Sequence, residues 1–162
     1  MRHVAFDAKT HDHQACIAAA MKDAEQYCQT KGLRLTPIRR RVLELIWQSH
    51  QPHGAYQVLE QLTQEGHQPS PPTVYRALDF LLAHGLIHKV NSQNAYVGCT
   101  RPGEAHDAQL FICDGCGVTV EQTDMTIYRR VLQNAAALKF QVHRQTVEIS
   151  GLCAQCAGNA DA

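Results

Sequence analysis

The sequence lacks several features that would place the protein in a membrane or outside the cell. No apolar run approaches the roughly 20 residues that a helix needs to cross a bilayer. The start of the chain, MRHVAFDAKTHDHQ, has no apolar signal core, so we expect a cytoplasmic protein. Internal repeats of diagnostic period, low-complexity tracts and Gly-rich phosphate loops are also missing. A globular chain remains, and its 162 residues with 44% hydrophobic content suffice for a packed core.

The chain also lacks an excess of basic charge, because 15 Lys and Arg residues balance 15 Asp and Glu residues. Residues 1–90 contain ten basic and eight acidic side chains, whereas residues 91–162 contain five and seven. One basic cluster without any acid occupies residues 31–41 and consists of Lys31, Arg34, Arg39, Arg40 and Arg41. A DNA-binding surface would therefore have to be a local patch in the first half of the chain.

The first half has the pattern of a winged helix-turn-helix unit over residues 13–99, after a polar and flexible start at residues 1–12. Thr36 is a good N-cap for the second helix, since Pro37 suits the first helical position. Ser70 caps the fourth helix in the same way, and residues 50–54 form a turn. We expect helices over residues 13–30, 37–46, 56–65 and 73–84, then strands over 86–90 and 95–99.

The second half predicts a smaller α/β unit, which makes the whole chain α+β. Residues 100–107 are expected to link the two units, and residues 158–162 form a short tail. Between them, at residues 108–157, we expect strands over 109–113, 118–122 and 141–150 and a helix over 126–139.

Four of the seven cysteines form two C-x-x-C pairs, Cys113 with Cys116 and Cys153 with Cys156. Thiols in a cytosolic protein stay reduced, which favours metal binding over disulfides. Two residues between thiols let one turn present both sulfurs to one ion, and four thiolates suit tetrahedral Zn²⁺ at about 2.3 Å per bond. A thioredoxin-like redox pair and two unrelated pairs are the alternatives. A redox pair opens a helix, whereas a strand-like run follows Cys116. The spacing predicts a structural zinc site.

The start of the fourth helix is the candidate recognition element, because helix-turn-helix proteins read base edges with these residues. Arg76 points away from the apolar face of this helix, and arginine is the commonest reader of guanine. Thr73 and Tyr75 are candidates for phosphate or thymine-methyl contacts. Arg39 and Arg34 belong to the basic cluster and are candidates for phosphate contacts. Solvated side chains and a core position for Tyr75 are the alternatives.

Several runs in the sequence resemble the ferric uptake regulator family, and within it the zinc uptake regulator branch. LRLTPIRRRVLELI (33–46) and PPTVYRALDFLLAHGLIHKV (71–90) are similar to its DNA-binding half. FICDGCG (111–117) and SGLCAQC (150–156) are similar to its zinc module. The resemblance implies a homodimer that represses zinc-uptake genes when it carries zinc. It also implies that Tyr56 and Arg76 contact double-stranded operator DNA, with one dimer or two on each operator.

The resemblance further implies two zinc ions per subunit. The four cysteines would hold a structural ion, and a regulatory ion would be held by His88, Cys99, His106 and Glu121. No spacing rule obliges these last four residues to meet. If they do meet, one thiolate, two imidazoles and one carboxylate favour zinc over iron, and Cys99 decides this preference. The ion would then fix the angle between the two units.

The sequence departs from iron-sensing relatives, and some residues stay without an assigned role. Iron sensors resemble one another in a His-rich cluster before the first C-x-x-C, where this chain has only His106, and a further family histidine is replaced near Gln145. An iron- or peroxide-responsive regulator stays as the alternative within the family. A zinc enzyme is the alternative from another class, but both expected sites are closed by four protein ligands. Cys16 and Cys28 are expected to pack, and His13 has either a weak metal-binding role or none.

Overall fold

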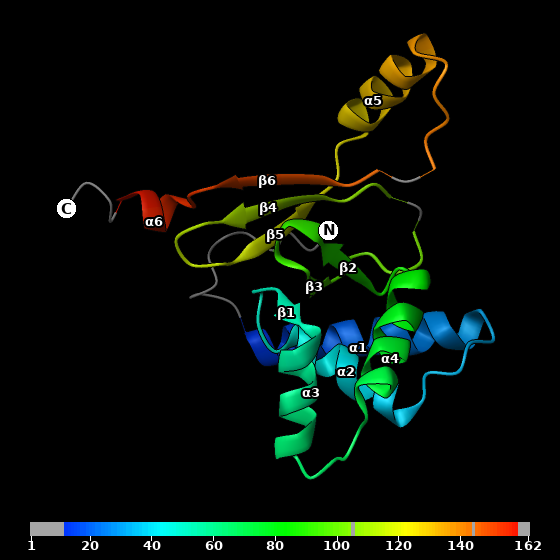
Figure 1. The fold of residues 1–162 in the computed structure, drawn as a ribbon, viewed down its shortest axis with the longest axis vertical. Helices are drawn as coiled ribbons and strands as arrows, with labels where there is room; N and C mark the ends of the chain where they lie inside the picture. The colour runs from blue at the N-terminus through cyan, green and yellow to red at the C-terminus, as the bar shows by residue number, and fades with distance from the viewer. Residues whose placement is uncertain (1–11, 105, 144, 159–162) are drawn as a thin grey trace.

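Two units follow one another in this computed structural model, which describes residues 12–104, 106–143 and 145–158. The helical unit runs from α1 to β3, and the sheet unit runs from β4 to α6 (Figure 1). The α+β fold class expected from the sequence is confirmed. The flexible start expected at residues 1–12 and the tail at 158–162 lie almost entirely outside the described residues. In the described part of the chain, no helix combines the length and the apolar character needed to span a bilayer.

Four helices form the body of the helical unit: α1 (His13–Thr30), α2 (Pro37–Trp47), α3 (Ala55–Gln64) and α4 (Pro71–Ala83). The Thr36 side chain caps α2 by accepting a hydrogen bond from the Arg39 amide at 3.4 Å, as predicted. Ser70 is the N-cap residue of α4, but its hydroxyl bonds the Thr73 hydroxyl at 3.0 Å instead of a backbone amide. The prediction that Ser70 is the N-cap of α4 is therefore confirmed, but its side chain does not make the expected hydrogen bond to a backbone amide.

The wing of the helical unit consists of β2 (Ile87–Val90), the short 3-10 helix η1 (Asn91–Gln93) and β3 (Ala95–Gly98). Strands β2 and β3 pair antiparallel, and β1 (His53–Gly54) adds to the other edge of β3. The sequence predicted only a turn at residues 50–54. That prediction missed β1 because two residues carry no periodicity.

A close contact joins the wing to the helices. A Cβ added at Gly98 would lie 2.2 Å from the Trp47 ring, so only glycine lets the strand approach the end of α2. The contact places Cys99, the next residue, beside the helical body.

The sheet unit contains β4 (Gln109–Cys113), β5 (Thr119–Gln122) and β6 (Val147–Gly151) in the order β5-β4-β6. β4 pairs antiparallel with β5 and parallel with β6. The prediction of one strand over residues 141–150 was wrong in its first half, since β6 begins only at Val147. Helix α5 (Met125–Ala137) extends away from the sheet (Figure 1). The short helix α6 (Ala154–Gly158) follows β6, and no pattern in the sequence predicted it.

The two units have very different cores. A large cluster of buried apolar side chains from α1 to α4 supports the helical unit, with Leu45, Leu62, Leu78 and Leu81 fully buried. Among the described residues, the second cluster has four buried members, Val90 and Val97 from the wing and Leu110 and Ile112 from β4. The sheet unit thus has little apolar core, and part of that core is shared with the wing.

Candidate metal centres and nucleic-acid interface

The four cysteines of the two C-x-x-C pairs come together at one end of the sheet. Cys113 ends β4, and its partner in the first pair, Cys116, lies in the turn before β5. Cys153 and Cys156 follow β6, which is parallel to β4, so both pairs leave the sheet at the same edge. The four sulfurs all lie within 4.8 Å of one another, and the cysteines form no disulfide.

Hydrogen bonds within the four-cysteine cluster favour a thiolate at Cys113. The backbone N–H of Cys153 lies 3.3 Å from the Cys113 sulfur and lowers the pKa of this thiol to about 6. Hydrogen bonding to Cys153 and to Cys113 raises the pKa of Cys156 to about 12. Four sulfurs this close cannot all be thiolates without a cation between them, and Zn²⁺ would remove this repulsion. The donor set therefore fits a structural zinc ion.

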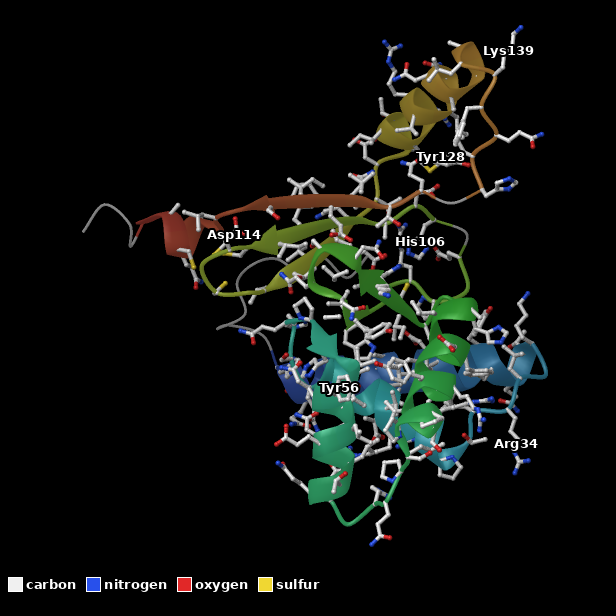
Figure 2. All side chains as sticks on the ribbon, in the orientation of Figure 1. Arg34, Tyr56, His106, Asp114, Tyr128 and Lys139 are labelled. Carbon is white, nitrogen blue, oxygen red and sulfur yellow. The ribbon has the colours of Figure 1, made fainter. Side chains whose placement is uncertain are left out.

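A second cluster joins the two units and contains His88, Cys99, His106 and Glu121. His88 belongs to β2, Cys99 follows β3, His106 lies in the connecting segment and Glu121 belongs to β5. Their ligand atoms all lie within 4.8 Å of one another. The Oε1 atom of Glu121 lies 2.6 Å from His106 Nε2 and 3.1 Å from His88 Nε2, and the Cys99 sulfur lies 3.5 Å from His106 Nε2. We call these four residues the mixed site; Figure 2 labels His106 between the sheet and the helices.

Further hydrogen bonds orient the mixed site. The Nδ1 atom of His106 lies 2.8 Å from the Glu104 carbonyl oxygen, which can only accept, so Nε2 is left to face the other three residues. Thr100 donates from its amide and its hydroxyl to Glu121 Oε2, both at 2.8 Å, and thereby leaves Oε1 for the cluster. Metal-bound histidines and carboxylates are commonly fixed by such partners.

Opposite charges face one another across the mixed site. Hydrogen bonding of the His106 ring to Cys99 and to Glu121 raises the pKa of His106 to about 10. Burial would lower the pKa of His88, but the same two partners outweigh it and raise that pKa to about 9. Burial would raise the pKa values of Cys99 and Glu121, but the two imidazoles lower both.

The mixed site fits a divalent ion. Only 4% of the Glu121 side chain and 6% of the His106 side chain are exposed. Two anionic and two neutral ligands would neutralise Zn²⁺ at this nearly dry position, and a thiolate with two imidazoles favours zinc.

The predicted DNA-contact residues lie on the helical unit. Tyr56 at the start of α3 is 72% exposed and Tyr75 in α4 is 40% exposed, so the core position considered for Tyr75 is wrong. Arg76 and Arg34 are also exposed, and Thr73 is half-buried. Figure 2 shows Tyr56 and Arg34 on the helical unit, below the sheet unit in this view.

The basic cluster at residues 31–41 is less free for DNA than its sequence indicates. Arg39 stacks on the Phe80 ring at 3.7 Å and donates to the Arg34 carbonyl at 2.7 Å. Arg40 pairs with Glu25 and Glu44, and Arg41 pairs with Glu44 and Glu65. Glu25 belongs to α1 and Glu65 follows α3, so no local pattern could have predicted these two pairs. Glu44 belongs to α2 itself, four residues after Arg40 and three after Arg41, and its pairing follows the local helical spacing.

A third group of candidate ligands was not predicted as a cluster. His13 and Cys16 in α1 meet His50 in the turn after α2, and their ligand atoms lie within 4.8 Å of one another. The sequence places His50 more than thirty residues from the others, so only their position in the fold reveals the group.

Comparisons with known proteins agree with this architecture. The model of the ferric uptake regulator family matches residues 30–150. The zinc uptake regulation protein of Escherichia coli strain K12 is 39% identical over 137 residues, which cover 84% of this chain and 80% of that protein. A solved zinc uptake regulator complexed with zinc and DNA has a TM-score of 0.84 and 36% identity, and the match covers 94% of this chain and 100% of that one.

The two solved forms of the protein XcZur differ in their likeness to this structure. The holo form has a TM-score of 0.81 at 43% identity, with 86% of this chain and 98% of that chain covered. The apo form has a TM-score of 0.51 at the same 43% identity, with 87% and 97% covered. Because the sequence identity is equal, the difference in TM-score reflects conformation.

Proposed function

The chain belongs to the ferric uptake regulator family, and on that premise we propose that it is a zinc-responsive transcriptional repressor. It binds palindromic double-stranded operator DNA as a zinc-loaded homodimer and controls zinc-uptake genes. The observation that carries the proposal is the mixed site, where a thiolate, two imidazoles and a carboxylate from both units lie within reach of one ion.

Zinc acts in this proposal by fixing the angle between the two units. His88 and Cys99 come from the wing, whereas Glu121 comes from the sheet unit, so one ion at the mixed site would bind both. Two recognition helices in a dimer must lie about one DNA turn apart, near 34 Å, and a variable angle would scatter this spacing. Zinc selects the binding-competent angle, and a tenfold gain in DNA affinity requires only about 1.4 kcal/mol of coupling.

The likeness to XcZur supports this mechanism. The present structure resembles the holo form of that relative far more than its apo form. A change in the relative position of the two units is the simplest difference that lowers a TM-score at constant identity. The zinc- and DNA-bound relative, with a TM-score of 0.84, supports the same conformation as the one that binds DNA.

The dimer is expected to form through the sheet unit. Large apolar side chains are exposed there at Met125, Ile127, Leu138 and Phe140, on and just after α5. Exposed apolar patches commonly mark protein interfaces. Accordingly, we assign residues 13–99 to DNA binding, residues 100–107 to the hinge and residues 108–157 to dimerisation and metal binding.

Each subunit would hold two zinc ions under this proposal. The four-cysteine site would hold a structural ion, and the mixed site would hold the regulatory ion. No organic cofactor and no catalytic residue are part of it, since the members of this family are transcription regulators. Whether one dimer or two occupy an operator depends on the operator itself.

The experiment that tests the proposal is a zinc titration of DNA binding with the Cys99→Ser variant. A palindromic AT-rich duplex and a scrambled duplex serve as probes in a gel shift. Each is tested over a series of buffered free Zn²⁺ concentrations and, separately, of free Fe²⁺ concentrations. Wild type should bind the palindrome only at sufficient zinc, whereas Cys99→Ser should stay a folded dimer that zinc no longer stimulates. Zinc-stimulated binding by Cys99→Ser as strong as in wild type would refute the regulatory site, and stimulation by Fe²⁺ alone would favour an iron sensor.

A further inference from the structure

His13, Cys16 and His50 form a compact group that neither proposed zinc site uses. His13 is the first residue of α1, and Cys16 lies one turn further along the same helix, so the two side chains share a face. His50 belongs to the turn between α2 and β1, and its ring lies 4.9 Å from the His13 ring in an edge-to-face arrangement. One ligand atom from each residue falls within 4.8 Å of the others.

The His13 ring is oriented in the way that metal-bound histidines usually are. Its Nε2 atom lies 2.6 Å from the Gln48 carbonyl oxygen, and because that oxygen can only accept, Nε2 carries the proton. The other ring nitrogen, Nδ1, is then a lone-pair donor. His106 in the mixed site has the same arrangement with its nitrogens exchanged, since its Nδ1 bonds the Glu104 carbonyl. Such a bond to a carbonyl fixes both the tautomer and the ring direction.

The turn that carries His50 is already held in place. The Ser49 hydroxyl accepts a hydrogen bond from the Gln51 amide at 3.1 Å and lies 3.0 Å from His53 Nε2. The His50 carbonyl accepts from the Thr119 amide of β5 at 2.8 Å. Gln51 donates to the carbonyl of Cys116 at 2.7 Å. The turn thus lies against the sheet unit, between the four-cysteine site and the strand that carries Glu121.

We propose that His13, Cys16 and His50 bind a third Zn²⁺ ion. Two imidazoles and one thiolate are ligands that zinc accepts in tetrahedral sites, at about 2.0–2.3 Å. Bonds of that length place ligand atoms roughly 3.3–3.8 Å apart, so a small closure of the present group completes the geometry. The Cys16 thiol releases its proton to solvent as the ion binds, and no redox step is involved.

The third ion would tie the start of α1 to the turn that lies on the sheet unit. Cys16 lines a small cavity together with Asp23, Trp47 and Cys99, so the group borders the side of the mixed site that faces the helices. Asp23 lines the same cavity as Cys16, so its carboxylate adds negative charge on this side of the group. With three ligands from the described residues, against four at each of the other two clusters, this ion should be the first to leave when zinc is limiting.

A zinc titration of the full-length protein tests the proposal. Metal-free wild type, Cys16→Ser and His50→Gln are titrated with zinc chloride against a chromophoric chelator. His67→Gln, which replaces a histidine on the surface far from the group in sequence, is the matched control. Each site variant should bind one equivalent less than wild type and His67→Gln, and a far-UV spectrum monitors folding. The result is the difference in bound zinc between variant and wild type, so it does not depend on the proposed repressor function. Cys99→Ser, which changes the mixed site, should separately lose one equivalent.

Hydrogen exchange gives a second readout that a merely structural role would not change. In wild type, the last zinc equivalent should slow exchange of the amides at residues 14–18 and 49–51, and in the two site variants it should not. Equal zinc content in wild type and either variant overturns the three-residue site, and so does unchanged exchange at both segments on full loading. If a variant fails to fold, Co²⁺ is added stepwise to metal-free wild type and the cobalt–thiolate absorption bands are recorded. Bands that stop growing after two equivalents, which fill the four-cysteine and mixed sites, would overturn the proposal.

Discussion

Glu148 in β6 caps the wing at Asn91, since its Oε1 atom accepts a hydrogen bond from the Asn91 amide at 2.6 Å. Its Oε2 atom accepts a second bond from the Ser92 amide at 3.1 Å. Burial would raise the pKa of Glu148, but these donors outweigh it and lower the pKa. One carboxylate of the sheet unit thus holds the tip of the wing and fixes the two units at a second point, two strands across the sheet from Glu121.

Replacing Glu148 should weaken DNA binding without removing zinc. In Glu148→Gln the charge-assisted bonds are lost, and we expect about 1 kcal/mol less coupling between the units, or about fivefold weaker operator binding at saturating zinc. Fluorescence anisotropy with a labelled operator measures the affinity, and metal analysis measures zinc. Glu25→Gln, which replaces an exposed carboxylate 2.8 Å from Arg40, is the control. Equal operator affinity in Glu148→Gln and wild type would contradict the positioning role.

Thr100 should tune zinc affinity through Glu121. The Thr100→Val change removes the hydroxyl that donates to Glu121 Oε2 at 2.8 Å but keeps the backbone bond. Loss of such an outer partner typically weakens a metal site by about tenfold or more. Competition titration should show this loss for the regulatory ion alone. Thr63→Val, where the hydroxyl bonds only within α3, should leave affinity unchanged, and a similar loss in both variants would argue against a specific effect.

Removal of the structural ion should unfold the sheet unit first. This unit contributes only Leu110 and Ile112 to the second buried cluster, so the four-cysteine site has to supply much of its stability. Strong chelation, or the Cys156→Ser change, should abolish hydrogen-exchange protection in β4, β5 and β6, while α2 and α4 stay protected by their own core. Protection in the three strands that survives complete zinc removal would show that the metal is dispensable for folding.

Arg76 and Arg39 should behave differently when each is replaced by alanine. Arg76 is exposed, so Arg76→Ala should leave stability unchanged and reduce specific operator affinity by about 1–3 kcal/mol. Arg39 stacks on Phe80, so Arg39→Ala should also lower the thermal midpoint. Anisotropy on specific and scrambled duplexes, together with thermal denaturation, separates the two effects. A scrambled-duplex loss equal to the operator loss would reassign Arg76 to phosphate contact.

The ion pair between Arg41 and Glu65 should make a small, pH-dependent contribution to stability. The hydrogen bond from Arg41 lowers the pKa of Glu65 from its ordinary value of 4.5. The contribution is therefore complete above about pH 4.5 and disappears as the pH falls through the lower folded value. Because both side chains of the pair are partly exposed to solvent, Glu65→Gln should cost only about 0.5 kcal/mol at neutral pH. Urea denaturation of both proteins at several pH values should show the two curves converging on acidification; a difference that grows instead has the wrong sign.

The sequence alone determined the features that depend on neighbouring residues. Thr36 with Pro37 set the start of α2, because capping and the fixed φ of proline act within one helical turn. The C-x-x-C spacing determined each half of the four-cysteine cluster for the same reason, since one turn presents both thiols of a pair. The family resemblance supplied the mixed site, since nothing in the spacing of Cys99 and Glu121 requires them to meet. Hydrophobic periodicity did not predict β1, which has only two residues. It also predicted too long a strand before Val147, because apolar and polar residues alternate there without pairing to another strand.

Only the tertiary structure decided which distant side chains share one place. It put Glu148 on the wing, neutralised Arg41 with Glu65, and brought His50 to His13 across 37 residues of chain. These contacts result from how α1, the wing and the sheet pack, and packing is set by the burial of whole apolar faces, not by the polar residues that become neighbours. A sequence pattern records which face of each element is apolar. It does not record which polar side chains from different elements become neighbours once those faces are buried.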